Sequence, residues 1–142
     1  MKAAGPSALR REGGIAALEF VLMLPFLLVV LFGIIDVSMI LCDKAVITNA
    51  SREAARAGVV LRVPPWNSAQ IQNVALSYTR NNLVSGGTPA AATAVAQVGT
   101  QAQGSPLTVT VSYTYQGLVL GSIFSAITGP VTISAVTVMN YE

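Results

Sequence analysis

The sequence is short of the side chains that carry most enzyme and metal chemistry. It has no histidine and one cysteine. Zinc sites need several Cys, His or carboxylate ligands close together, and one cysteine cannot form an intrachain disulfide. No serine or threonine has a convincing base near it in the sequence, and no glycine-rich phosphate loop follows a predicted strand. We therefore predict no catalytic residue, no metal site and no cofactor.

Charge is also scarce and unevenly placed. Charged residues make up 10% of the chain and hydrophobic residues 53%, whereas an ordinary soluble domain carries about 25% charge. Lys2, Arg10 and Arg11 precede the first apolar run, and the side-chain charges from Ile15 onward sum to zero. This leaves no basic patch for nucleic acid. Part of the chain is expected to lie in lipid.

The run Ile15 to Ile35 contains a single charged residue, Glu19. As a helix, a run of this length spans about 31 Å, which matches the hydrocarbon core of a bilayer. Basic residues precede the run and Asp36 and Asp43 follow it. By the positive-inside rule, we predict a single membrane pass with a cytoplasmic N-terminus. Pro25 removes one backbone donor from this helix and predicts a kink there.

Glu19 needs a partner, because a carboxylate in lipid costs about 3 kcal/mol. Cleavage between Gly14 and Ile15 would create an α-amine that is mostly protonated at neutral pH, and Glu19 would then be the fifth residue of the mature chain. The carboxylate would lie one helical turn from its own amine, or beside the amine of an adjacent subunit. Either pairing offsets the burial of two charges.

Four motifs in register resemble a known family. They are Gly14 with Ala17-Leu18-Glu19-Phe20, then Leu24-Pro25, then Gly33-Ile34-Ile35-Asp36, and finally Asn49 to Gly58 with its Arg52, Glu53 and Arg56. Gly14 followed by an apolar helix with glutamate at mature position five resembles the class III leader of type IV pilins. The glutamate–aromatic pair Glu19-Phe20 resembles the Flp/Tad branch. Together, residues 13–58 resemble the TadE-like family, although Val37-Ser38 departs from its usual pattern after Asp36.

The resemblance implies a minor pilin or pseudopilin that helps assemble a Tad/Flp pilus for surface adhesion. It implies a bacterial inner-membrane protein whose partners are a prepilin peptidase, other Tad pilins and inner-membrane platform proteins. The domains would be a cleaved leader (1–14), a transmembrane and stem helix (15–60) and a small extracytoplasmic domain (61–142). Two alternatives are an uncleaved signal-anchored envelope protein with a partner-binding domain, and a secreted domain. The secreted domain is disfavoured because no A-x-A-like site follows the run.

The helix is expected to continue past the membrane to a stop at Gly58, giving one helix of about 40 residues. Its apolar face is predicted from five residues with helical spacing: Ile40, Ile47, Ala50, Ala54 and Ala57. Six polar residues are assigned mostly to other faces: Asp43, Lys44, Thr48, Ser51, Arg52 and Arg56. Arg52, Glu53 and Arg56 form either a solvated face or a subunit contact. Cys42 is interpreted as a buried or lipid-facing small hydrophobe.

The rest of the chain predicts an α+β domain. A second helix capped by Asn67 or Ser68 is expected to end near Leu83, with Ile71, Val74, Ala75 and Tyr78 on one face. Residues 107–115 and 131–139 alternate apolar and polar residues, which indicates two antiparallel strands, and residues 94–98 predict a weaker edge strand. The helices are expected to cover one face of this sheet. Trp66 is interpreted as a core residue, and 118–127 as a covering loop or helical turn.

Overall fold

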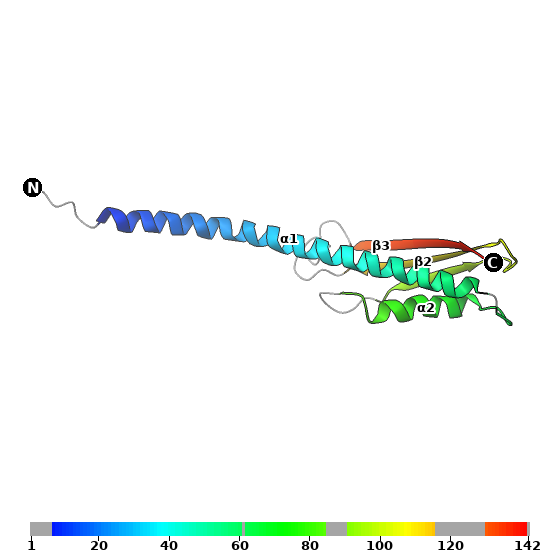
Figure 1. The fold of residues 1–142 in the computed structure, drawn as a ribbon. Coiled ribbons are helices and arrows are strands. Elements are labelled where there is room, and N and C mark those ends of the chain that lie inside the picture. Colours follow the sequence, from blue (N-terminus) through cyan, green and yellow to red (C-terminus); the bar gives the residue numbers. More distant parts are fainter. Residues whose placement is uncertain (1–6, 61, 85–90, 116–129, 142) are drawn as a thin grey trace, which may run out of the picture. The chain divides into compact units, whose positions relative to one another are not determined.

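A computed structural model of the chain describes residues 7–60, 62–84, 91–115 and 130–141. Its elements are α1 (Ser7–Val59), α2 (Ser68–Arg80), β1 (Thr93–Val98), β2 (Pro106–Tyr115) and β3 (Val131–Asn140), shown in Figure 1. This confirms the predicted α+β class. The chain divides into two units, Met1–Ile35 and Asp36–Glu142, which are described separately. The predicted loop at 118–127 lies outside the described residues.

The first unit contains the beginning of α1. This helix starts at Ser7 and includes Pro25 without ending there. Its described side chains from Gly14 to Ile35 are exposed or partly exposed, and most of them are large and apolar. Such a helix buries almost nothing within its own chain. It is long and apolar enough to cross a membrane, which fits a single-pass membrane protein.

In the second unit, α1 buries one face against the rest of the domain. The buried residues recur at helical spacing and are Asp36, Asp43, Ile47, Ala50, Ser51, Ala54, Ala55 and Gly58. The predicted apolar face is confirmed at Ile47, Ala50 and Ala54. The assignment of Asp43 and Ser51 to a polar face is wrong, because both residues are buried. Small residues dominate the end of this face, so the helix approaches the sheet closely.

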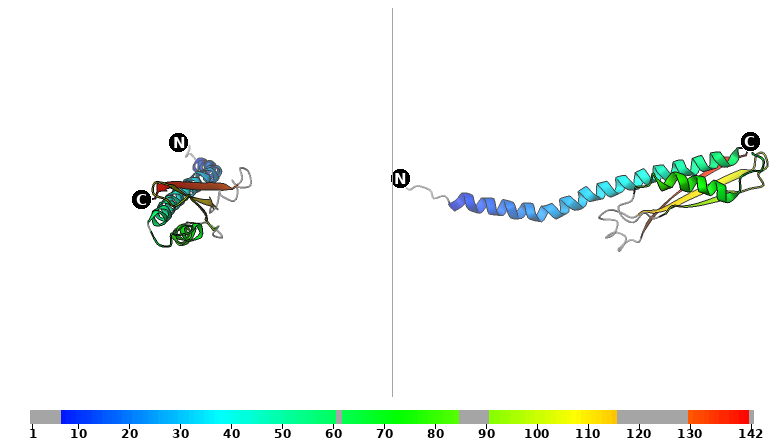
Figure 2. Two further views of the ribbon diagram at one scale, coloured as in Figure 1. Left: turned by 90° about the vertical axis from the view of Figure 1, so that its right-hand side faces the viewer. Right: turned by 90° about the horizontal axis from the view of Figure 1, so that it is seen from below.

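The three strands form one antiparallel sheet in the order β1-β2-β3. In the central strand β2, Leu107 pairs with Val98 of β1 on one side and with Met139 of β3 on the other. Side chains in β2 alternate regularly, with the odd-numbered residues from Leu107 to Tyr115 buried. The predicted pairing and the predicted edge position of the short strand are therefore confirmed. The second half of α1 and the helix α2 run alongside each other in the views of Figures 1 and 2.

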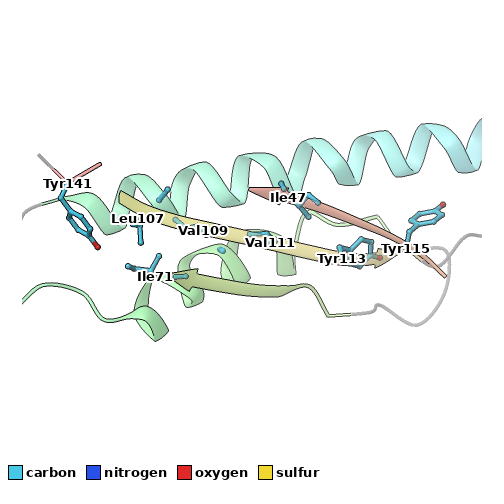
Figure 3. Packing of buried hydrophobic residues seen from close by; sticks show 13 residues of the cluster. Ile47, Ile71, Leu107, Val109, Val111, Tyr113, Tyr115 and Tyr141 are labelled. Atoms are coloured by element: carbon cyan, nitrogen blue, oxygen red, sulfur yellow. The ribbon is translucent and has the colours of Figure 1, made fainter. Parts of the chain in front are cut away.

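The core lies between the sheet and the two helices. Figure 3 shows Leu107, Val109, Val111 and Tyr113 in a row along β2, with Ile47 on α1 and Ile71 on α2. The helix α1 ends at Val59, one residue after the predicted stop at Gly58. A Cβ on Gly58 would come within 2.5 Å of Leu107 Cδ2 and 2.9 Å of Ile71 Cδ1. The glycine is therefore needed for close packing where the two helices meet the sheet.

Helix α2 begins with a capping box. The Asn67 side chain accepts from Gln70 N at 2.9 Å, and Gln70 Oε1 accepts from Asn67 N at 3.0 Å, which satisfies two donors of the first turn. The helix ends at Arg80, earlier than predicted, with Asn81 as its C-cap. Its buried residues are Ile71, Ala75 and Thr79. These three residues are spaced four apart and form the buried face of α2. Tyr78 is exposed, so its assignment to this face is wrong.

The segment before α2 packs against the core through Trp66. This side chain is partly buried against the hydrophobic cluster, as predicted. The Arg62 guanidinium lies 4.0 Å from the centre of its ring, within cation–π range. Gln101 Nε2 also donates to Trp66 O at 2.8 Å. These contacts fix the connection between α1 and α2 to the end of the sheet.

Candidate membrane and assembly segment

Gly14 and Ile15 both lie in the helical part of the first unit, and both are exposed. A Cβ placed on Gly14 would meet nothing within 4 Å. Packing within this chain therefore gives no reason for a glycine at this position, in contrast to Gly58. A helix interior also disfavours glycine relative to alanine by about 1 kcal/mol. Packing in the described part of the chain therefore does not account for a glycine at this position.

Glu19 is an exposed carboxylate among exposed apolar side chains. Ile15, Leu18, Phe20 and Val21 around it are each at least 60% exposed. Within the described residues, Glu19 has no hydrogen-bond or ion-pair partner. The described side chains around Glu19 therefore provide an apolar surface and no compensating charge. The charge pairing predicted for Glu19 and Phe20 needs an amine at Ile15 or a second molecule.

The stem residues Arg52, Glu53 and Arg56 all point away from the core. Each is exposed, and no ion pair joins them in the part of the chain that the structure describes. They lie on the side of α1 opposite the buried small residues Ala50, Ser51, Ala54 and Ala55. This arrangement fits both of the interpretations left open by the sequence, a solvated face and a subunit contact.

Cys42 lies at the beginning of the second unit. The thiol is free and exposed. Of the two positions predicted for this thiol, burial within the chain does not occur, and a position facing lipid stays a prediction.

A buried polar pair that the sequence reasoning missed lies close to the beginning of the second unit. Tyr115 OH donates to Asp36 Oδ1 at 3.2 Å, and the same hydroxyl lies 3.5 Å from Met39 Sδ. Asp36 and Tyr115 are both almost fully buried. Burial, together with the neighbouring Asp36 carboxylate, raises the pKa of Tyr115 to about 12. The hydroxyl stays protonated and joins β2 to the first turn of the stem.

Asp43 lies two turns further along α1 and is fully buried. Its Oδ1 accepts a hydrogen bond from Val84 N at 2.7 Å, whereas Oδ2 has no partner among the described residues. Burial raises the pKa of Asp43, and the Val84 bond opposes this only in part. The Tyr113 hydroxyl is also buried without a described partner. Burial, then the Asp43 charge, raises the pKa of Tyr113.

Two polar contacts join α1 to β3. Ser51 Oγ and Thr137 Oγ1 lie 2.7 Å apart in a hydrogen bond, and Lys44 Nζ donates to Ser134 O. Asp36, Asp43 and Ala50 are spaced seven residues apart, which places them on one face of the helix. This spacing is the signal in the sequence that could have identified the two buried aspartates. Ser51 gave no such signal, because its contact depends on a strand 86 residues away.

Comparison with known proteins bears on the first part of the chain. Residues 14–56 match the family described as TadE-like protein. No curated protein and no solved structure matches the chain significantly. The matched segment contains the predicted cleavage site, Glu19, Pro25 and the stem motif, and the family is a structural, pilus-associated one. Over residues 14–56 the chain is therefore similar to the TadE-like family, which is related to the pili of Tad systems.

Proposed function

We propose that this chain is a minor pilin or pseudopilin subunit for assembly of a Tad/Flp-type pilus involved in surface adhesion. The observation that carries the proposal is where the TadE-like segment starts. The match begins at Gly14, the residue after which the leader is predicted to end. The glycine has no packing role in the fold, which supports recognition by a peptidase as its reason.

In this proposal a prepilin peptidase removes residues 1–14 on the cytoplasmic side, and residues 15–60 form the membrane and stem helix. Residues 61–142 form a small domain outside the cytoplasm. The chain would thus be a single-pass protein of the bacterial inner membrane that is passed to a pilus assembly. Its partners there would be other Tad pilins and inner-membrane platform proteins.

Glu19 would act as the charge partner of a mature N-terminus. The exposed carboxylate lies four residues from Ile15, which is about one helical turn. Inserting this carboxylate into lipid without a partner costs about 3 kcal/mol, and an amine on the same or an adjacent helix offsets that cost. Pairing between subunits would also set the axial register of neighbouring helices. The exposed ring of Phe20 would lie beside this contact.

The decisive measurement is the N-terminal mass of the protein extracted from membranes. With a working prepilin peptidase, we expect the chain to start at Ile15. Gly14→Leu should block processing, whereas Gly13→Ala, a change one residue away, should leave it unchanged. An intact leader in the wild-type chain would contradict the proposal and favour an uncleaved, signal-anchored envelope protein with a partner-binding domain.

A second experiment separates membrane insertion from assembly. Glu19→Gln should insert as well as the wild type or better, because a charge is removed from lipid. We expect it to reduce pilus number, whereas Leu22→Ala on the same apolar helix should change pilus number little. A normal pilus count with Glu19→Gln would exclude the charge-pairing role of Glu19.

A further inference from the structure

Burial makes the exposed surface of the second unit more basic than its sequence. From Asp36 onward the sequence has five basic and four acidic side chains. Asp36 and Asp43 are buried, and Glu53 is the one exposed acid among the described residues of this unit. An excess of one sign on a surface attracts partners of the opposite charge. All five basic side chains are exposed: Lys44, Arg52, Arg56, Arg62 and Arg80.

Three of these basic side chains have a role within the fold. Lys44 Nζ donates to a backbone carbonyl of β3, and the Arg62 guanidinium lies over a tryptophan ring. Arg80 lies in the last turn of α2, where a cation offsets the negative end of the helix dipole. Within the described residues, Arg52 and Arg56 make no hydrogen bond, ion pair or ring contact. No contact in the described fold therefore uses their two charges.

Arg52, Glu53 and Arg56 share one face of α1. With 3.6 residues per turn, their side chains leave the helix within about 100° of one another. Arg52 and Arg56 are one turn apart, a spacing at which like charges repel. Glu53 and Arg56 are three residues apart, a spacing at which opposite charges can pair, yet no ion pair joins them in the described structure. All three charges therefore face outward and remain available to another molecule.

The same face continues toward the beginning of the second unit. Ala45, Asn49, Arg52 and Arg56 follow one another at intervals of four, three and four residues, and all four are exposed. A second helix packs along a seam with this spacing. Together with Glu53, these four residues are called the stem face. Its spacing suits a helix as the partner, and its charges suit an acidic one.

We propose that the stem face binds a helix of another polypeptide that carries two carboxylates one turn apart, with a basic side chain beside them. The guanidinium groups of Arg52 and Arg56 would each pair with a carboxylate, which can accept two parallel hydrogen bonds from an arginine. The basic side chain would pair with Glu53. This charge pattern would also reject helices of the wrong charge order. The proposal rests neither on the predicted cleavage nor on Glu19, so N-terminal mass and helix binding test the two proposals separately.

A second copy of this chain fits the stem face less well. Two copies that met through this face would bring arginines against arginines, because each has two arginines and one glutamate there. Such like-charge contacts are costly, and the described part of the second unit exposes no other acid to replace them. A phosphate-rich surface also fits less well, because its charges would repel Glu53. Charge complementarity therefore favours an acidic helix of mixed charge from a different polypeptide.

The test uses the full chain in a non-ionic detergent and a labelled, alanine-rich helical peptide. The peptide carries two glutamates four residues apart and a lysine directly after the first glutamate. Fluorescence anisotropy should show saturable binding. A second peptide of the same composition, with its three charges on different faces of the helix, should bind about tenfold more weakly. Equal binding of the two peptides, or no saturable binding of the first, would overturn the proposal.

Matched substitutions locate the binding on the chain. Arg56→Gln should weaken binding about tenfold. Arg80→Gln removes an equal charge from α2 and should change binding by less than about twofold. Equal effects of the two substitutions would mean non-specific attraction and would overturn the proposal. So would displacement of the peptide by inorganic polyphosphate at the same concentration of charge.

Charge reversal gives a test that gains binding instead of losing it. The variant Arg52→Glu/Glu53→Lys/Arg56→Glu should lose the acidic peptide and bind a peptide in which glutamates and lysine are exchanged. The three side chains are exposed, so the core should stay intact, which urea unfolding can verify. Failure of the reversed pair to bind would overturn the proposal. Spontaneous disulfide dimers of Asn49→Cys in a Cys42→Ser background in membranes would do so too, because they would identify a second copy as the occupant.

Discussion

Replacing Asp43 by asparagine should stabilise the second unit at neutral pH. The carboxylate is fully buried, and one of its oxygens has no partner in the described chain. Asparagine keeps an oxygen for the Val84 N–H and removes the charge, and its amide nitrogen takes the place of the unpartnered oxygen. Leaving a buried polar group unsatisfied costs about 1–3 kcal/mol, and more when the group is charged. Because only the charged part of this cost is removed, we expect a gain of about 1 kcal/mol in unfolding free energy at pH 7.

The stability gained by Asp43→Asn should depend on pH. Burial raises the folded-state pKa of Asp43 above the ordinary aspartate value of 3.8, so the folded state binds the proton more tightly than the unfolded state does. The stabilisation from this proton is complete below the unfolded-state pKa and is lost as pH rises through the folded-state pKa. Each unit of pKa difference contributes about 1.4 kcal/mol. The advantage of Asp43→Asn should accordingly shrink toward zero near about pH 4.

The assay is urea unfolding of the full chain in mild detergent, followed by the fluorescence of Trp66. This is the only tryptophan, and it packs against the core. Asp43→Ala is the matched control, because it removes the charge but also leaves Val84 N without its acceptor. A lower stability of Asp43→Asn at pH 7, with no change at acid pH, would refute the reasoning. That result would mean that the ionised carboxylate is fully satisfied in the fold.

Three further predictions concern the same domain. Gly58→Val should lower the unfolding free energy by about 1–3 kcal/mol, because its side chain would overlap those of Leu107 and Ile71; unchanged urea unfolding would show that the core repacks freely. Tyr115 should titrate near 12 by ultraviolet absorbance, against 10.0 for an exposed tyrosine. The folded state keeps that proton, so stability should fall by about 3 kcal/mol between about pH 10 and 12, and Tyr115→Phe should remove this part of the slope. Asn67→Ala should cost about 1 kcal/mol by removing the cap of α2; an unchanged unfolding midpoint would mean that the capping box is dispensable.

The strands show how far local pattern determines structure. Residues 107–115 alternate strictly, and β2 buries every second side chain as that pattern predicts. A central strand has a neighbouring strand on each side and one face on the core. Its side chains therefore alternate between the core and the opposite face, which matches the alternation of apolar and polar residues in the sequence. The edge position of β1 also followed from its weaker pattern. For β3 the pattern predicted a strand but not the contacts that Lys44 and Ser51 of α1 make with it, since these residues are far away in the sequence.

The helix α1 shows where local pattern fails. Asp43 and Ser51 were assigned to a polar face because both side chains are polar. The structure buries both, because the sheet packs against the face on which Asp36, Asp43, Ile47 and Ser51 lie. Gly58 is next to the end of α1, as the sequence predicted, but the pattern did not show that Leu107 and Ile71 pack closely against it. In each case the deciding neighbour is far away in the sequence.

The sequence by itself determined the apolar membrane helix, the single charge within it and the TadE-like motifs, as well as the α+β class. These follow from local features: a long apolar run, a residue spacing, a two-residue period. Only the tertiary structure decided which polar groups of the stem are buried and which glycine packs closely against the core. Those properties depend on contacts between distant segments, and packing and desolvation there outweigh the local preference of a single side chain.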